Sequence, residues 1–120
     1  MGKLIHLVED DEDIRFIVEY VLMEEGYSVT SSANVKDFYS FIKENQPDLI
    51  LLDVMLPDGN GIEICRGLKD DERTANVKII IMSAHAAEKA VLEEACSDGF
   101  ISKPFDLDAL VSHVNKILAS

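Results

Sequence analysis

Four places in this sequence carry side chains whose types could handle phosphate groups or metal ions. In chain order they are the acidic triplet Glu9-Asp10-Asp11, then Asp53, Ser83 and Lys103. Together they supply several carboxylates, one hydroxyl and one ammonium group. Carboxylates held close together repel one another, so a site built from them requires a cation.

The ligand types narrow the choice of cation. Oxygen ligands select a hard ion, and a small carboxylate set with open water positions suits Mg²⁺ better than Ca²⁺. A calcium-binding EF-hand is excluded because neither residues 11–15 nor residues 58–61 continue into the required loop. Zinc is excluded because the histidines and cysteines lack its ligand spacing. The sequence therefore favours a magnesium site.

The same side chains fit one class of reaction. An aspartate carboxylate can attack phosphorus and form an aspartyl phosphate. Phosphoryl transfer depends mainly on positioning and on neutralising negative charge, and a magnesium ion with a lysine can supply both.

The elements that must position these groups follow from the hydrophobic pattern. Short apolar runs, typical of strands, alternate with segments whose apolar residues recur at helical spacing. The runs are Leu4–Val8, Tyr27–Ser31, Leu49–Asp53, Val77–Met82 and Gly99–Ser102. The first, second and last helical stripes are clear, whereas the third helix (about Ile62–Lys69) and the fourth (about Glu88–Ala95) are weaker. Five strands alternating with five helices predict βαβ units and a parallel sheet.

This order predicts a doubly wound α/β fold with one domain over residues 1–120. Leu49–Leu52 is apolar without alternation, as expected for a strand covered on both faces. Gly26 is expected to end the first helix, residues 57–61 to form a turn or loop, and Asp106 to cap the last helix. Binding sites of such folds lie at the carboxyl ends of the strands, where all four polar groups fall.

Composition excludes other classes of function. The chain has 11 basic and 23 acidic residues, for a net charge of −12. That charge disfavours direct binding to nucleic acid and favours cations or basic protein surfaces. The sequence has no signal-peptide layout and no apolar run of membrane-spanning length, so we expect a cytoplasmic protein without membrane binding. Cys65 and Cys96 form no CxxC pair, which favours free thiols.

Four motifs stand in order at the expected strand ends. They are Leu7-Val8-Glu9-Asp10-Asp11 with Arg15, Leu51-Leu52-Asp53-Val54-Met55-Leu56-Pro57 with Gly61, Met82-Ser83-Ala84, and Ser102-Lys103-Pro104-Phe105. Each is a weak signal alone, but together they resemble the receiver domain of two-component response regulators over essentially the whole chain. The resemblance implies a flavodoxin-like sheet of strand order 2-1-3-4-5.

The resemblance also implies roles at the metal. Asp53 would be the phosphoacceptor and a magnesium ligand. Asp10 would be the principal acidic ligand, with Glu9 acting through water, and the backbone carbonyl of Met55 would complete the protein ligands to Mg²⁺.

Further roles concern the phosphorylated state. Lys103 would pair with Asp53 and later with a phosphoryl oxygen, across a peptide bond to Pro104 that the resemblance favours as cis. Ser83 would turn its hydroxyl to the phosphoryl group, and Phe100 would swing inward as Ser83 moves. The stretch between Ser83 and Phe100 departs from the family pattern.

The predicted function is a phosphorylation-controlled switch rather than a turnover enzyme. Its implied partners are a sensor histidine kinase or histidine phosphotransfer protein, and a downstream protein or effector domain. One alternative is a degenerate receiver that serves as a protein scaffold without phosphorylation. An aspartate-nucleophile phosphatase is disfavoured because its general-acid Asp is replaced here by Met55. A flavin-binding protein is disfavoured because Glu9-Asp10-Asp11 would repel the cofactor phosphate.

Overall fold

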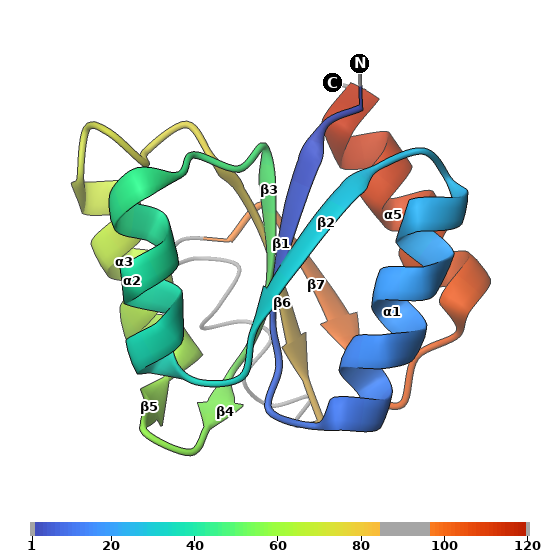
Figure 1. The fold of residues 1–120 in the computed structure, drawn as a ribbon, viewed down its shortest axis with the longest axis horizontal. Coiled ribbons are helices and arrows are strands. Elements are labelled where there is room, and N and C mark those ends of the chain that lie inside the picture. Colours follow the sequence, from blue (N-terminus) through green and yellow to red (C-terminus); the bar gives the residue numbers. More distant parts are fainter. Residues whose placement is uncertain (1, 85–96, 120) are drawn as a thin grey trace.

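A five-stranded parallel sheet forms the centre of the molecule (Figure 1). The computed structural model describes residues 2–84 and 97–119. The strands of this sheet are β1 (Leu4–Val8), β2 (Ser28–Ser32), β3 (Leu49–Asp53), β6 (Lys78–Ser83) and β7 (Gly99–Ser102). They lie in the order β2-β1-β3-β6-β7, which is 2-1-3-4-5 in chain order and confirms the prediction. Three strands have the predicted bounds, and the other two are shifted toward the carboxyl terminus.

Helices cover both faces of the sheet. The pair α1 (Glu12–Glu24) and α5 (Leu107–Ala119) lies on one face, and the pair α2 (Val35–Glu44) and α3 (Gly61–Asp70) lies on the other (Figure 1). The predicted fourth helix, at about residues 88–95, lies outside the described residues. A small antiparallel hairpin of β4 (Met55–Leu56) and β5 (Gly59–Asn60) overlaps the segment, residues 57–61, that we predicted as a turn or loop.

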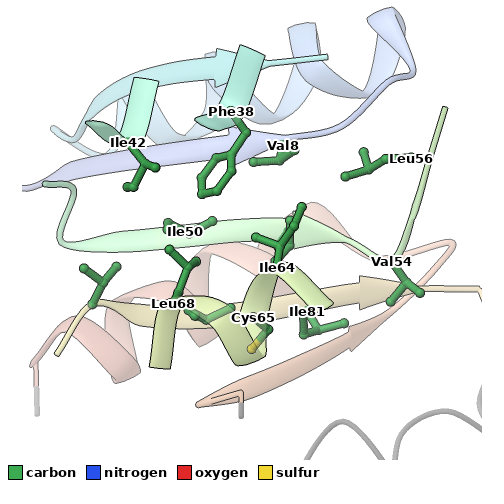
Figure 2. Close-up of a cluster of buried hydrophobic side chains, with 13 residues drawn as sticks. Val8, Phe38, Ile42, Ile50, Val54, Leu56, Ile64, Cys65, Leu68 and Ile81 are labelled. Carbon is green, nitrogen blue, oxygen red and sulfur yellow. The ribbon is translucent and has the colours of Figure 1, made fainter. Parts of the chain in front are cut away.

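The core is divided by the sheet into two clusters. Ile50 and Leu52 of β3 lie in the cluster beneath α2 and α3, with Phe38 from α2 and Ile64 from α3 (Figure 2). Leu49 and Leu51 lie in the cluster beneath α1 and α5. All five residues of β3 are buried, which confirms its prediction as a strand covered on both faces. Burying each of its four apolar side chains, Leu49 to Leu52, contributes about 1.5–3 kcal/mol, so β3 is held firmly in register.

Local signals mark the end of α1 and the start of α5 where the sequence predicted them. Gly26 follows α1 with φ of 95°, a conformation that suits glycine. Its N–H donates to Met23, and the next N–H, of Tyr27, donates to Leu22, which satisfies two terminal carbonyls of the helix. At the start of α5 the Asp106 carboxylate accepts the N–H of Asp108 at 3.1 Å, as expected of a cap.

One sequence prediction about the core is wrong. Cys65 is buried in α3, and it is disulfide-bonded rather than free. Spacing along the chain carries no information about which thiols a fold brings within bonding distance. The chain's other cysteine, Cys96, lies outside the described residues. Within residues 2–84 and 97–119, every helix is too short or too polar to span a lipid bilayer.

Candidate functional site

The polar side chains singled out in the sequence meet at the carboxyl edge of the sheet. Asp53 is the last residue of β3, and Ser83 is the last residue of β6. Glu9 follows β1 directly, and Lys103 follows β7 directly. Asp53 pairs with Met82 of the neighbouring strand, so Ser83 lies one residue beyond the level of Asp53. The predicted convergence of the strand ends is confirmed.

Three carboxylates form the acidic part of this edge. Oxygen atoms of Glu9, Asp10 and Asp53 all lie within 4.8 Å of one another. Glu9 is 1% exposed and Asp53 is 6% exposed, whereas Asp10 is exposed to solvent. The cluster therefore has two acids set into the protein and one at its surface.

Lys103 bridges the two buried acids. Its ammonium nitrogen lies 2.5 Å from Oε1 of Glu9 and 3.1 Å from Oδ2 of Asp53. Burial lowers the pKa of Lys103, but the hydrogen bond to Glu9 and the charge of Asp53 outweigh that effect and raise the pKa above its ordinary value. Lys103 therefore stays protonated and neutralises part of the acidic cluster.

Glu9 has a strongly shifted pKa. Burial raises the pKa of Glu9 to about 7, and the negative charge of Asp53 acts in the same direction. The hydrogen bonds from Lys103 and from the Asp11 N–H oppose this rise without cancelling it. The pKa of Glu9 therefore reflects mainly the removal of its carboxylate from water.

The turn that leads from β1 into α1 is held by a residue whose role the sequence did not reveal. The Arg15 guanidinium donates to the backbone carbonyls of Glu9 at 2.9 Å and of Asp10 at 3.2 Å. Asp11 turns away and caps α1 by accepting the N–H groups of Asp13 and Ile14. Asp11 is thus the capping residue of α1, and Arg15 orients the acidic turn from within α1.

Of the three other predicted residues, Ser83 and Met55 lie near the acidic residues along the chain or sheet, whereas Phe100 lies two residues before the level of Ser83. Ser83 is buried, and its carbonyl accepts the N–H of Lys103 at 2.8 Å. Met55 opens β4 with its side chain 67% exposed, two residues after Asp53. Phe100 is half-buried on β7 and packs against the cluster beneath α2 and α3. The peptide bond between Lys103 and Pro104 is cis, as the resemblance implied.

The arrangement fits a hard divalent cation. The three acidic groups offer only oxygen donors, and each has one oxygen within a span of 4.8 Å that a single ion could bridge. Asp10 is open to water, which suits an ion that keeps part of its hydration shell. A bound cation would favour the ionised form of Glu9, which burial disfavours.

An apolar cavity adjoins the acidic cluster at Lys103. It has a volume of about 460 Å³ and lies between α1 and the segment that joins β7 to α5. Its walls are formed by Ile14, Ile17, Ala84, Lys103, Pro104, Phe105 and Leu107. The acidic cluster therefore lies beside an apolar surface.

Comparison with known proteins agrees with this geometry. The family model for the response regulator receiver domain matches residues 5–115. The phosphate regulon transcriptional regulatory protein PhoB of Pseudomonas aeruginosa is 37% identical over 98% of this chain, and GltR of the same organism is 34% identical over 98%. The matches cover 52% and 49% of those two proteins, so the chain spans about half the length of these curated relatives.

Solved structures resemble the fold closely. A putative response regulator from Chloroflexus aurantiacus superimposes with a TM-score of 0.94 at 28% identity, over the full length of both chains. The receiver domain of sensor histidine kinase PA1611 from P. aeruginosa, with a magnesium ion in its active-site cleft, superimposes with a TM-score of 0.89 at 26% identity, again over both full chains. With the family model and the sequence relatives, these matches show that the chain belongs to the response regulator receiver domain family.

Proposed function

We propose that this chain is a working phosphoacceptor receiver of a two-component signalling system, with Asp53 as the phosphorylated residue. The observation that carries the proposal is the bridge that Lys103 makes between Asp53 and Glu9 within the acidic cluster. A degenerate receiver has no need of a buried carboxylate and a charged lysine held together, because burying charges costs free energy unless they are paired.

In this proposal Asp53 acts as the nucleophile. One of its carboxylate oxygens forms a bond to the phosphorus of a phosphohistidine while the phosphorus–nitrogen bond breaks, and the imidazole nitrogen keeps the electron pair. Lys103 lies 3.1 Å from Oδ2 of Asp53 and would neutralise charge on the transferred group. Ser83 would donate its hydroxyl to a phosphoryl oxygen once that group is in place.

Magnesium would be held by Asp10 and Asp53, by Glu9 through water, and by the backbone carbonyl of Met55. When bound, the ion supplies positive charge that screens the carboxylates from the incoming phosphoryl oxygens. The magnesium ion in the cleft of the PA1611 receiver domain supports this assignment.

The new phosphoryl group would then act as a conformational signal. It adds negative charge and strong acceptors beside Ser83 and Lys103, which biases the equilibrium between two conformations. We propose that Phe100 takes part by moving inward with Ser83. The chain would catalyse its own phosphorylation and dephosphorylation without turning over a free substrate.

The proposed partners are proteins in the cytoplasm. A sensor histidine kinase or histidine phosphotransfer protein would donate the phosphoryl group, and the apolar cavity beside Lys103 gives such a donor a surface to contact. A downstream protein or effector domain would read the switch, as the names of the transcriptional regulatory relatives indicate for those proteins.

The test is intact mass after incubation with acetyl phosphate, with and without Mg²⁺, for the wild-type chain and Asp53→Asn. We expect a magnesium-dependent gain of one phosphoryl group in the wild type and none in the variant. A wild-type chain that gains nothing from acetyl phosphate or from a panel of phosphorylated histidine kinases would instead be a scaffold of the degenerate class.

A further inference from the structure

The hairpin that follows Asp53 is attached to the start of a helix that is distant in sequence. The Asp58 carboxylate, in the turn between β4 and β5, accepts the N–H of Val35 at 2.7 Å and the N–H of Lys36 at 3.1 Å. These two donors belong to the first turn of α2 and lie 23 and 22 residues earlier in the chain. Figure 1 shows the hairpin at the same end of the molecule as the start of α2.

The contact is more than a helix cap. Helix α2 already has a local cap, because Asn34 accepts the N–H of Asp37 at 2.8 Å. Asp58 takes the two N–H groups that Asn34 leaves available, and both hydrogen bonds lower the pKa of Asp58, the one from Val35 most. The Gly59 backbone packs closely against Val35, since a Cβ at Gly59 would come within 2.7 Å of Val35 Cγ2. The hairpin thus contacts the first turn of α2 through both the Asp58 side chain and the Gly59 backbone.

The other end of the segment is fixed at Asp53 itself. The N–H of Gly61 donates to Val54 at 2.8 Å, and a Cβ on Gly61 would lie 2.2 Å from the Asp53 carbonyl oxygen. Between these two anchors the hairpin pairs Met55 with Asn60 and Leu56 with Gly59. Met55 therefore lies in a short antiparallel pair of strands. At one end this pair packs against the backbone of Asp53, and at the other end it is hydrogen-bonded to the first turn of α2.

We propose that Asp58 is a positioning residue of the magnesium site, which fixes the Met55 backbone by anchoring the hairpin to α2. This inference rests on the proposed function, in which the Met55 carbonyl is a magnesium ligand. Ordering a loop residue costs backbone entropy, and a metal ligand that is already ordered binds the ion without that cost. Loss of the anchor frees the hairpin tip and weakens binding of the ion, although Asp58 does not touch it.

The experiment measures Mg²⁺ affinity by isothermal titration calorimetry on the full chain, with the free energy of unfolding measured in parallel by urea denaturation. Asp58→Ala removes the anchor, and Asp58→Asn retains an acceptor oxygen for one of the two N–H groups. Val35→Pro removes one donor from the other side without changing the charge. Proline is tolerated at this first helical position, and the extended backbone of Asn34 is compatible with a following proline.

Asp48→Asn is the matched control. Asp48 is also an exposed carboxylate with a long-range hydrogen bond to backbone, accepting the N–H of Leu4 at 2.8 Å, but it lies at the opposite edge of the sheet. We expect the Mg²⁺ dissociation constant to rise about three- to tenfold in Asp58→Ala and less in Asp58→Asn, a smaller effect than that of groups bonded directly to metal ligands. Val35→Pro is also expected to raise the Mg²⁺ dissociation constant. The double variant Asp58→Ala/Val35→Pro should have nearly the same dissociation constant as Asp58→Ala, because both changes remove the same anchor.

The outcomes separate this inference from the proposed function. Unchanged Mg²⁺ affinity in Asp58→Ala and Val35→Pro, with a lower free energy of unfolding, would reduce Asp58 to a second cap of α2 and overturn the inference alone. An equal loss of affinity in Asp48→Asn would assign the effect to net charge and overturn it as well. A wild-type chain that binds Mg²⁺ no better than Asp10→Asn would overturn both this inference and the proposed magnesium site.

Discussion

The two edges of the central sheet both carry acidic residues, but they use them in opposite ways. At the amino edge, Asp48 accepts the N–H of Leu4 and Asp98 accepts the N–H of Ile79, each at 2.8 Å. Asp98 also pairs with Lys69 at 3.1 Å. Each of these carboxylates has a strand N–H of its own, so the amino edge satisfies its charges locally.

The carboxyl edge leaves its charges partly unsatisfied. Glu9, Asp10 and Asp53 lie together there, and the ion pairs of the described residues give this group a single lysine, Lys103. Glu9 is also buried, and burial raises its pKa to about 7. Convergence of three carboxylates around one shared lysine, rather than the number of acids, distinguishes this edge from strand ends whose carboxylates each accept a backbone N–H.

The largest difference between the edges should come from removing their lysines. Lys103→Met is expected to slow phosphorylation by acetyl phosphate roughly 10²–10³-fold, as when one charge-stabilising donor is lost from an active site. Lys69→Met, which breaks the pair with Asp98, should change that rate less than about twofold. Time courses of intact mass give both rates, and equal losses in the two variants would contradict the distinction between the edges.

The second-largest difference between the two edges is expected in Mg²⁺ affinity. Asp10→Asn is expected to weaken Mg²⁺ binding about 10–100-fold, because it removes one of the three converging carboxylates. Asp98→Asn carries the same charge change at the amino edge and keeps an acceptor for the Ile79 N–H. It should bind Mg²⁺ with unchanged affinity in calorimetric titration. Comparable weakening by both variants would mean that the field of the whole chain, with net charge −12, attracts the ion.

The pH dependence of stability should report the burial of Glu9 at the carboxyl edge. The folded-state pKa of Glu9 is about 7, above its ordinary value of 4.5, so the folded chain holds a proton that the unfolded chain releases in this window. Stability contributed by Glu9 therefore falls as pH rises from about 4.5 to 7. Glu9→Gln should stabilise the metal-free chain by about 1–2 kcal/mol at pH 8 and little at pH 4.5.

Urea denaturation of the metal-free chain at both pH values measures this difference. Asp48→Asn is the matched control, because its carboxylate is exposed and has a backbone partner. It should show no gain in stability at pH 8. His6, which is buried and has a pKa lowered to about 4, is present in both chains, so its contribution cancels in the comparison. A gain for Glu9→Gln that is the same at both pH values would refute the assignment to Glu9 ionisation.

The smallest expected effect is purely structural. Asp98→Ala leaves the Ile79 N–H and the Lys69 ammonium without their carboxylate partner. We expect a loss of about 1 kcal/mol in the free energy of unfolding, the net value of a typical hydrogen bond. Phosphorylation by acetyl phosphate should proceed at the wild-type rate, and a variant impaired in that reaction would show that the amino edge contributes to function.

Much of this architecture was predictable because strand ends are local signals. Glu9, Asp53, Ser83 and Lys103 each follow a short apolar run, and a parallel sheet must bring such ends to one edge. The two-residue strands of the β4–β5 hairpin were missed because segments that short show no periodicity. The sequence indicated only that Asp58 lies in a turn. Its hydrogen bonds to α2 could not be predicted, because no spacing pattern relates these two segments of the chain.

By itself, then, the sequence determined the order of the elements and which side chains stand at the ends of the strands. Both depend on hydrophobic periodicity and on local breaks in it. Only the tertiary structure decided that Lys103 contacts Glu9 and Asp53, which lie 94 and 50 residues away. It also decided that Glu9 is buried while Asp10 is open to water. Pairing and desolvation arise from neighbours distant along the chain, and they set the charge of the site.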